Sequence, residues 1–384
     1  MSSPLNKYLL LLFLIANATA EYIALMSVSD ILFYAVLGLS TLVVLSNNGF
    51  GSKYRKECKS MFVLMGIYAI AQILQMDVYT TSKMLYTISK IVVLCTTVYC
   101  VSNNYDYYSK DIIMPFSYVI VALIAVGWVH NRYGYGGENM GYLIFGFANR
   151  NAACTLSSIG YAGFLFMRDK LKMTDYICIA ILLLTVLIGG SRNALAMCIL
   201  ITMVRFGVSV RMMFVGLISI IAIIFILPSL GIEFEAITRI EGTLNGTVAL
   251  DREEEREAAW WMALQRPWTG WGYNVENIGY AASLTEYGAH NGYYTSLKNL
   301  GFPLGGLLIY TIVWGGIKRL KLYFLKDRVL NFHLAVVVAI LFGAYQEDYL
   351  VGVNQITTNV FFWSFTVLGV WMSRNKALYK SLKI

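Results

Sequence analysis

One of the chain's three histidines stands where a long polar segment meets an apolar one. His290 and Asn291 lie at this boundary, inside the stretch TEYGAHNGYYTSLKNLGFPLGG. Imidazole is the side chain best suited to accept a proton near neutral pH, so His290 is a candidate general base. Asn291 would orient the ring or hold a substrate hydroxyl. The alternative is structural, a hydrogen-bonded histidine beside an asparagine that caps a helix.

Arginines form a second set of candidates, each beside an apolar run or in the polar segment. Arg150 lies with Asn151 in GFANRNAAC, and Arg192 lies in IGGSRNALAM. Arg252 and Arg256 are four residues apart in DREEEREAAWWMALQRP, so they share one face of a helix. A guanidinium group binds phosphate oxygens in bidentate fashion. These residues are therefore candidates for holding a diphosphate.

An arginine at membrane depth costs about 2.5–3.5 kcal/mol even on lenient insertion scales. A lipid diphosphate would supply the counter-charge at headgroup depth. The alternative is that Arg150 and Arg192 extend to anionic lipid, or pair with Glu347 or Asp348 in YQEDY. Cationic neighbours would also depress the pKa of His290 and keep the ring neutral, as a base must be.

The elements that must position these residues are membrane helices. Hydrophobic residues make up 58% of the chain, charged residues 14%, and the mean hydropathy is +0.61. A soluble domain carries about 25% charged residues, and apolar runs of about 17–20 residues can cross a bilayer as helices. We therefore expect an all-α, polytopic transmembrane bundle of about twelve spans. The runs fall near residues 8–27, 31–47, 61–76, 85–101, 112–129, 142–167, 176–190, 194–207, 212–230, 291–316, 331–350 and 355–373.

Basic residues set the orientation of these spans. Cytoplasmic loops accumulate lysine and arginine, and basic clusters follow the second, sixth, eighth, tenth and last runs. All of these clusters fall on one side when both termini are cytoplasmic. The formal charge of +8 therefore reflects topology and contact with anionic membrane lipids. It does not indicate nucleic-acid binding, because the chain has no compact basic domain.

Three parts follow from this topology: residues 1–230 with nine spans, an outer loop subdomain at 231–290, and residues 291–384 with three spans and a basic tail. The loop contains ten acidic and four basic residues, and a connection of this length is usually functional. Strong helix formers before a proline predict a helix over residues 251–266. The candidate residues then gather at the outer face.

The first apolar run also resembles a signal peptide, because a short apolar core precedes the small residues Ala18-Thr19-Ala20. We favour an uncleaved first helix. Cleavage would leave eleven spans with the same orientation. The six cysteines fall in spans or on the inner side, so we expect no disulfide in the outer loop.

Four motifs follow one another in this chain. They are GFANRN in a span, SR at a hairpin, REAAWWMALQRPWTGWG in the outer loop, and HNGYYTSLKNLGFPLGGLL. Their order resembles that of the O-antigen ligase and polysaccharide polymerase superfamily of bacterial inner membranes. The strongest similarity covers residues 185–315, and a weaker part extends back to about residue 140.

The resemblance implies a GT-C-like membrane glycosyltransferase that needs no metal or other cofactor and whose active site faces the periplasm. Such enzymes transfer a glycan from undecaprenyl diphosphate to an acceptor sugar hydroxyl. Carried over to this chain, Arg192 and Arg256 would hold the donor diphosphate, with Arg150 and Arg252 beside them. His290 would be the general base. A regulator of chain length is a further partner that the resemblance suggests.

Two activities compete within the superfamily: polymerases extend the glycan on its lipid carrier, whereas ligases move the finished chain onto lipid A core. The ligase pattern is His, then Asn, Ser or Gln, nine residues, Gly, two residues, and Gly, Thr or Tyr. His290, Asn291 and Gly301 fit this pattern, but Leu304 stands at its last position. The departure favours a polymerase, with a ligase as the alternative.

Two other function classes stay open. A transporter of lipid-linked glycans needs ionisable residues deep in its spans, for which Lys90, Lys298 and Glu21 are the candidates, but no half-repeat is evident. A metal-dependent transferase would use outer acidic pairs such as Glu347 with Asp348. Acidic residues on a loop are more often simply solvated, which argues against the metal-dependent class. Both classes therefore rank below the metal-independent glycosyltransferase.

Overall fold

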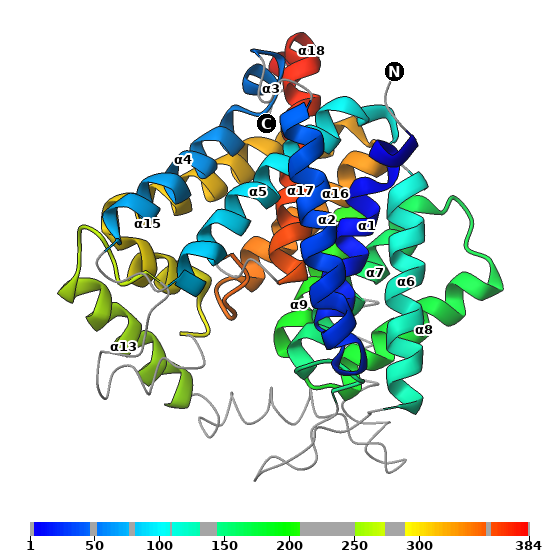
Figure 1. Ribbon diagram of the computed structural model, residues 1–384. Helices are drawn as coiled ribbons and strands as arrows, with labels where there is room; N and C mark the ends of the chain where they lie inside the picture. Colours follow the sequence, from blue (N-terminus) through cyan, green and yellow to red (C-terminus); the bar gives the residue numbers. More distant parts are fainter. Residues whose placement is uncertain are drawn as a thin grey trace.

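The computed structural model describes residues 4–46, 52–76, 81–107, 110–130, 144–207, 250–272, 289–350 and 355–382. This part of the chain consists of helices and their connections, with no strand (Figure 1), so the all-α expectation is confirmed. The helices are α1 (Pro4–Ala20), α2 (Met26–Ser46), α3 (Ser52–Glu57), α4 (Lys59–Leu74), α5 (Thr81–Asn103), α6 (Lys110–Val129), α7 (Arg150–Met167), α8 (Met173–Ile188), α9 (Arg192–Phe206), α13 (Leu250–Gln265), α15 (Gly292–Leu320), α16 (Arg328–Gly343), α17 (Ile356–Arg374) and α18 (Lys376–Ser381).

Several of these helices can cross a bilayer. Four described segments are long and apolar enough, namely Met84–Asn103, Asp111–Val129, Gly292–Leu325 and Ile356–Arg374, and five shorter apolar helices accompany them. Large apolar side chains such as Ile31, Leu42 and Ile73 are exposed on the outside of the bundle, where a lipid environment would cover them. The chain is therefore a membrane protein. The count of twelve spans stays a prediction, and the run at 212–230 lies outside the described residues.

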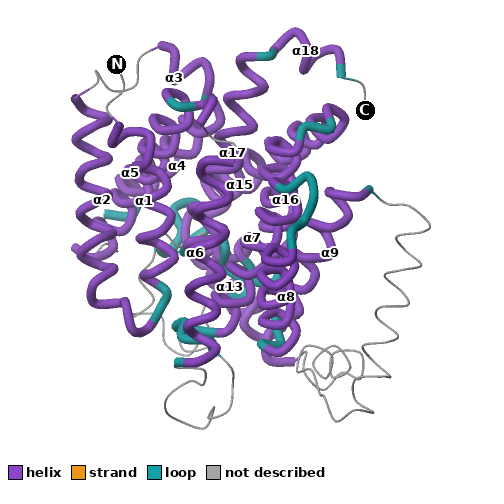
Figure 2. Tube along the Cα trace, turned by 90° about the vertical axis from the view of Figure 1, so that its right-hand side faces the viewer, coloured by secondary structure: helices purple, strands orange, loops and turns teal. Residues whose placement is uncertain are grey.

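The helices stand side by side as a bundle (Figure 2). Both termini lie at one end of it, together with α3 and α18 (Figures 1 and 2). The expectation that both termini lie on the cytoplasmic side of the membrane stays a prediction. The predicted helix 251–266 appears as α13, and the rest of the expected outer loop is described only at 266–272 and 289–290.

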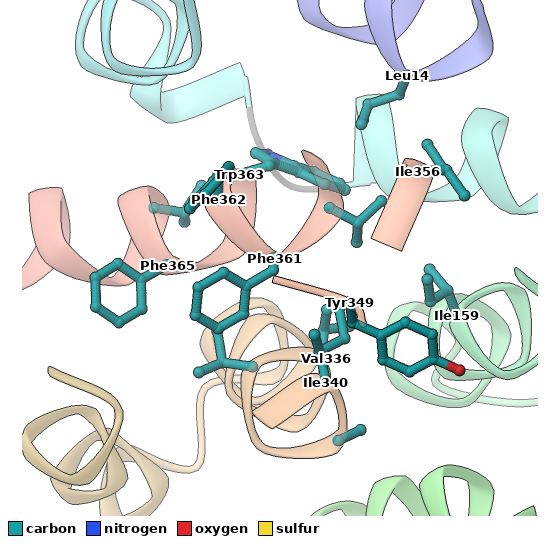
Figure 3. Close-up of a cluster of buried hydrophobic side chains, with 14 of the residues drawn as sticks. Leu14, Ile159, Val336, Ile340, Tyr349, Ile356, Phe361, Phe362, Trp363 and Phe365 are labelled. Atoms are coloured by element: carbon teal, nitrogen blue, oxygen red, sulfur yellow. The ribbon is translucent and has the colours of Figure 1, made fainter. Parts of the chain in front are cut away.

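α17 forms the centre of the bundle. Its aromatic residues Phe361, Trp363 and Phe365 are fully buried, and Figure 3 shows Phe361 on the side of Val336 of α16, with Trp363 on the opposite side of α17. Buried aromatic side chains of this size remove about 150–250 Å² each from the solvent. The turn that follows α16 is therefore held by a rigid core. This turn carries acidic side chains.

The first helix is part of this core. Phe13 and Leu14 of α1 are fully buried, and Asn359 of α17 donates a hydrogen bond to the Asn17 side chain at 2.7 Å. A buried amide–amide bond of this kind would leave unsatisfied polar groups if α1 were removed. The first helix is therefore held in the core by apolar packing and by a buried polar contact.

Two predicted spans are shorter as helices than their apolar runs. The run at 142–167 becomes helical only at Arg150, because Asn149 caps α7 by accepting a hydrogen bond from the Ala152 amide at 2.8 Å. The run at 331–350 stops being helical at Gly343, and a turn follows at residues 344–350. Both breaks place polar residues at one end of the bundle.

α15 bends at Gly301, which has φ 72° and ψ 171°. Pro303 has no amide hydrogen, so the carbonyl of Asn299, four residues earlier, loses its helical partner. The amide of Gly272 replaces that partner at 2.9 Å, and the Gln75 side chain also donates to the same carbonyl. The segment that follows α13 thus completes the hydrogen bonding of α15.

Two further backbone bonds fasten this segment to α15. The Trp271 amide donates to Lys298 O at 2.9 Å, and the Phe302 amide donates to Pro267 O at 2.7 Å. Gly270 has φ +68°, and a Cβ there would collide with the backbone of Asn299 and Gly301. The glycines of the PWTGWG motif therefore serve a backbone-to-backbone junction, which we call the 267–272 junction. It positions α13 against α15.

Candidate active site

The head of α15 is tied to the turn between α16 and α17. The Gly292 amide donates to Ala344 O at 2.7 Å and to Glu347 O at 3.1 Å. The hydroxyl of Thr295 donates to Asp348 Oδ1 at 2.6 Å, and the Asn291 amide donates to the same oxygen at 3.2 Å. Burial raises the pKa of Asp348 above its usual range. The first turn of α15 and the 344–350 turn therefore form one hydrogen-bonded unit.

Asn291 caps α15 in this unit. Its side-chain oxygen accepts from the amides of Tyr293 and Tyr294 at 3.0 and 3.1 Å, and its side-chain nitrogen donates to Tyr345 O at 3.1 Å. Both ends of the amide are thus occupied, and the side chain is buried. This geometry matches the capping alternative, and contact of Asn291 with a substrate hydroxyl stays a prediction. Asn291 fixes the helix end that follows His290.

His290 lies between two carboxylates. Nδ1 is 3.3 Å from Glu347 Oε2, and Nε2 is 3.7 Å from Glu255 Oε2 of α13. The His290 backbone has φ 43°, a left-handed conformation that is uncommon for a residue with a side chain. The surrounding hydrogen bonds hold this strained conformation, which aims the ring at Glu347.

Asn151 completes the arrangement from α7. Its side-chain nitrogen donates to Glu347 Oε1 at 2.8 Å, so Glu347 connects Asn151 with His290. Asn151 therefore holds the carboxylate that faces His290, and a role for Asn151 in orienting the ring or binding the acceptor stays a prediction. Glu347 appeared in the sequence as a counter-charge for arginine or as a metal ligand. Its place beside a histidine 57 positions away has no local sequence signal.

Two acidic side chains lie close to His290, and the expected cage of arginines around it stays a prediction. The carboxylates of Glu347 and Glu255 lie within 4 Å of the ring, and a carboxylate at this distance stabilises a positive charge on an imidazole. The sequence places the arginines on the same side of the membrane as His290, but it does not say which wall of the site each side chain occupies.

Arg256 reaches the same turn from α13. One of its terminal nitrogens lies 3.3 Å from Tyr345 O and 3.3 Å from Gln346 Oε1, and the guanidinium stands 5.2 Å from the centre of the Tyr345 ring. Its neighbour Glu255 faces His290. α13 therefore brings a cation and an anion to the two sides of the 344–350 turn. The side chain of Arg252, one turn earlier on α13, lies outside the described part of the structure.

Arg150 and Arg192 are the first residues of α7 and α9. The next residue after Arg192, Asn193, donates to the Tyr349 hydroxyl at 3.0 Å, and Thr155 of α7 shares a 2.7 Å hydrogen bond with that hydroxyl. The starts of α7 and α9 thus meet at Tyr349. The two arginines therefore stand on elements that adjoin the His290 site.

A cavity of about 630 Å³ opens beside His290. No arginine or lysine lines it among the residues that the structure describes, and its wall is made of carboxylates, amides and hydroxyls. The lining residues are Glu21, Ala148, Asn149, Asn151, Ala152, Thr155, Glu255, His290, Glu347, Asp348, Tyr349, Gln355 and Thr357. The described lining of the cavity that holds the histidine therefore carries four carboxyl groups and no described basic side chain.

Glu21 enters this cavity from the connection between α1 and α2. Its backbone carbonyl accepts from the Ala148 amide at 2.8 Å, and its Oε1 accepts from the Ile356 amide at 3.1 Å. Burial raises the pKa of this carboxyl to about 7. In the sequence, Glu21 stood out only as an ionisable residue near an apolar run. Its contact with α17, 335 positions later, could not be read from that run.

The metal alternative would need several ligands in one place. In the described part of the chain, no group of three His, Cys, Asp or Glu side chains is placed to hold a metal ion. All six cysteines are free.

Comparison with known proteins supports one family. Residues 177–309 match the family model described as O-antigen ligase, whereas no curated protein matches the chain. The matched segment includes Arg192, Arg256 and His290. The match over this segment confirms the resemblance to the O-antigen ligase and polysaccharide polymerase superfamily.

Proposed function

We propose that this protein is a membrane glycosyltransferase of the polymerase type, which transfers a glycan from undecaprenyl diphosphate to a sugar hydroxyl of a lipid-linked acceptor. The pairing of His290 with Glu347 beside a polar cavity is the observation that supports it most directly. We place the protein in the bacterial inner membrane with both termini in the cytoplasm, so that this cavity faces the periplasm.

His290 acts as the general base in this proposal. Glu347 accepts the Nδ1 hydrogen, which leaves the lone pair on Nε2 for the proton of the acceptor hydroxyl. Glu255, at 3.7 Å from Nε2, is too far away for a hydrogen bond. Its carboxylate, together with that of Glu347, stabilises the imidazolium that forms.

The acceptor oxygen attacks the anomeric carbon as it loses its proton. The bond between that carbon and the diphosphate oxygen breaks, and the lipid diphosphate leaves with the electron pair. A single displacement inverts the anomeric centre. Arg256 and Arg192, with Arg150 and Arg252 nearby, neutralise the charge that develops on the leaving group. This neutralisation takes the place of a divalent ion.

The ligase is the second candidate, because the matching family model is described as O-antigen ligase. Deletion of the gene in its native host separates the two activities. Loss of a polymerase leaves core glycan with a single repeat, whereas loss of a ligase strands finished polymer on its lipid carrier. Gel analysis of the glycans shows which product accumulates.

Replacement of His290 by alanine tests the chemistry itself. We expect the H290A protein to remain in the membrane and to lose glycan transfer in the complemented deletion strain. The matched control is His130→Ala, because His130 is exposed at the end of α6 and does not line the cavity. Glycans of wild-type length from H290A would rule out the general base.

A further inference from the structure

The cavity beside His290 has a second group of lining residues that the proposed chemistry does not use. Glu21 comes from the α1–α2 connection, Asn149 from the cap of α7, and Gln355 and Thr357 from the start of α17. Hydrogen bonds of Glu21 to Ala148 and Ile356 hold these three elements together. We call Glu21, Asn149, Gln355 and Thr357 the Glu21 wall.

This wall offers a hydrogen-bond acceptor that the described residues do not use. Gln355 Oε1 is buried, and it has no partner within the described part of the chain. The Glu21 carboxylate lies on the same wall and accepts from the Ile356 amide through Oε1. Buried polar oxygens are normally satisfied in a working protein. A ligand with a hydroxyl or ammonium donor would satisfy Gln355 Oε1.

The charge of the cavity limits the chemical class of ligand that it can bind. Four carboxyl groups line it, those of Glu21, Glu255, Glu347 and Asp348, and the described lining contains no lysine or arginine. A uronic acid or a phosphorylated sugar would bring a second negative charge against these groups, which costs binding energy. A neutral sugar avoids that repulsion, and an amino sugar gains attraction.

We propose that the Glu21 wall is the binding site for the acceptor sugar and that Glu21 selects a neutral or amino sugar over an acidic one. The inference rests on the proposed transferase function and adds to it the chemical class of the acceptor. It also separates the two substrates in space: the acceptor lies in the acidic cavity, and the donor diphosphate lies towards the arginines outside it.

Competition between glycosides tests this selectivity in the full-length protein. Transfer is measured in detergent or nanodiscs with lipid-linked repeats from the deletion host, and three probes compete: methyl glucoside, methyl glucosaminide and methyl glucuronide. We expect the wild-type enzyme to be inhibited at a concentration of glucosaminide about tenfold lower than that of glucuronide, a difference worth about 1.4 kcal/mol. Equal inhibition by the three probes, or none by glucosaminide, would overturn the proposal.

Variants then assign the selectivity to Glu21. Glu21→Gln keeps an oxygen for the Ile356 amide but removes the charge, so the preference for glucosaminide over glucuronide should fall to about twofold or less. Glu21→Asp retains the charge and should retain the preference. Asp30→Asn is the matched control, because Asp30 is exposed on α2. An unchanged preference in E21Q would contradict the role of Glu21.

The outcomes separate this inference from the function on which it rests. A wild-type protein that transfers no glycan refutes the transferase. A wild-type protein that transfers glycan through His290 but shows no preference among the three probes refutes only the acceptor site. Because the wild-type ranking needs no variant, the charge selectivity is tested even where a substitution at position 21 prevents folding.

Discussion

His290 Nδ1 lies 3.3 Å from Glu347 Oε2, and this contact joins the head of α15 to the turn before α17. The side-chain nitrogen of Asn151 donates to the other oxygen of Glu347 at 2.8 Å, so the carboxylate has little freedom to turn away. An acidic partner on Nδ1 fixes the tautomer of a catalytic histidine and stabilises its protonated form. The geometry makes Glu347 a positioning residue of the site.

Glu347→Gln should therefore lower the rate of glycan transfer about 100-fold or more, because an amide on Nδ1 can impose the opposite tautomer. Glu347→Asp should recover part of the rate, since it keeps the charge at a longer distance. The measurement is the initial rate of transfer in membrane vesicles. Glu253→Gln, on the exposed face of α13, is the control. A normal rate in E347Q would exclude the dyad.

Arg192→Lys and Arg256→Lys should each lower the transfer rate at least about tenfold. A lysine carries the same charge but does not reproduce the planar, bidentate binding of phosphate oxygens. The measurement is the transfer rate at several concentrations of lipid-linked donor. The loss should appear mainly in the dependence of the rate on donor concentration. Arg55→Lys is the matched control, because Arg55 is exposed on α3. Full activity with lysine at both positions would mean that a point charge suffices.

Gly270→Ala should weaken the 267–272 junction. A Cβ at position 270 would collide with the α15 backbone, and φ +68° is unfavourable for alanine, so a loss of about 1–3 kcal/mol of stability is expected. α13 should shift with it and move Arg256 and Glu255 away from the 344–350 turn. Thermal unfolding and transfer rate are the two readouts. Gly306→Ala is the control, because nothing lies within 4 Å of a Cβ there.

Glu21 should make the folded protein less stable as the pH rises. Its pKa is about 7 in the folded state, against an ordinary value of 4.5, so the folded protein binds more protons between these two values. Stability then falls as the pH increases through this window and is lowest above pH 7. Glu21→Gln should raise the melting temperature at pH 8 relative to wild type and have little effect near pH 4.5. An identical shift at both pH values would contradict the assignment of this pH dependence to Glu21.

Chelation should leave glycan transfer intact. The proposed mechanism neutralises the leaving diphosphate with arginines, so EDTA in the assay removes nothing that the reaction needs. Loss of activity with EDTA, and its recovery on adding a divalent ion, would favour the metal-dependent class instead. The same assay with Glu347→Gln would then show whether Glu347 contributes to ion binding.

The local features of this chain could be predicted from its sequence. The helix expected at 251–266 is α13 at Leu250–Gln265, and apolar runs such as 112–129 coincide with single helices. Helix periodicity, proline stops and long apolar runs are local signals, so they need no knowledge of the fold. His290 also lines a cavity, and its role as the general base stays a prediction.

The neighbours of His290 could not be predicted in the same way. The separation between Glu347 and His290 is 57 residues, and the residue that Glu21 binds, Ile356, is 335 residues further along the chain. Such contacts depend on how the helices pack, and a single sequence gives their side of the membrane at most. Helix packing places the carboxylates of Glu347 and Glu255 beside His290, whereas the cage of arginines around it stays a prediction.

The 267–272 junction has a consequence for changing the enzyme by exchange of loops. This segment supplies the hydrogen bond to α15 that Pro303 cannot make, so it is a structural part of that helix as well as of the outer loop. A graft from a related enzyme should therefore keep residues 267–272 together with their own α15, and join the foreign sequence before Pro267. A graft that divides them would open the helix from which the histidine is presented.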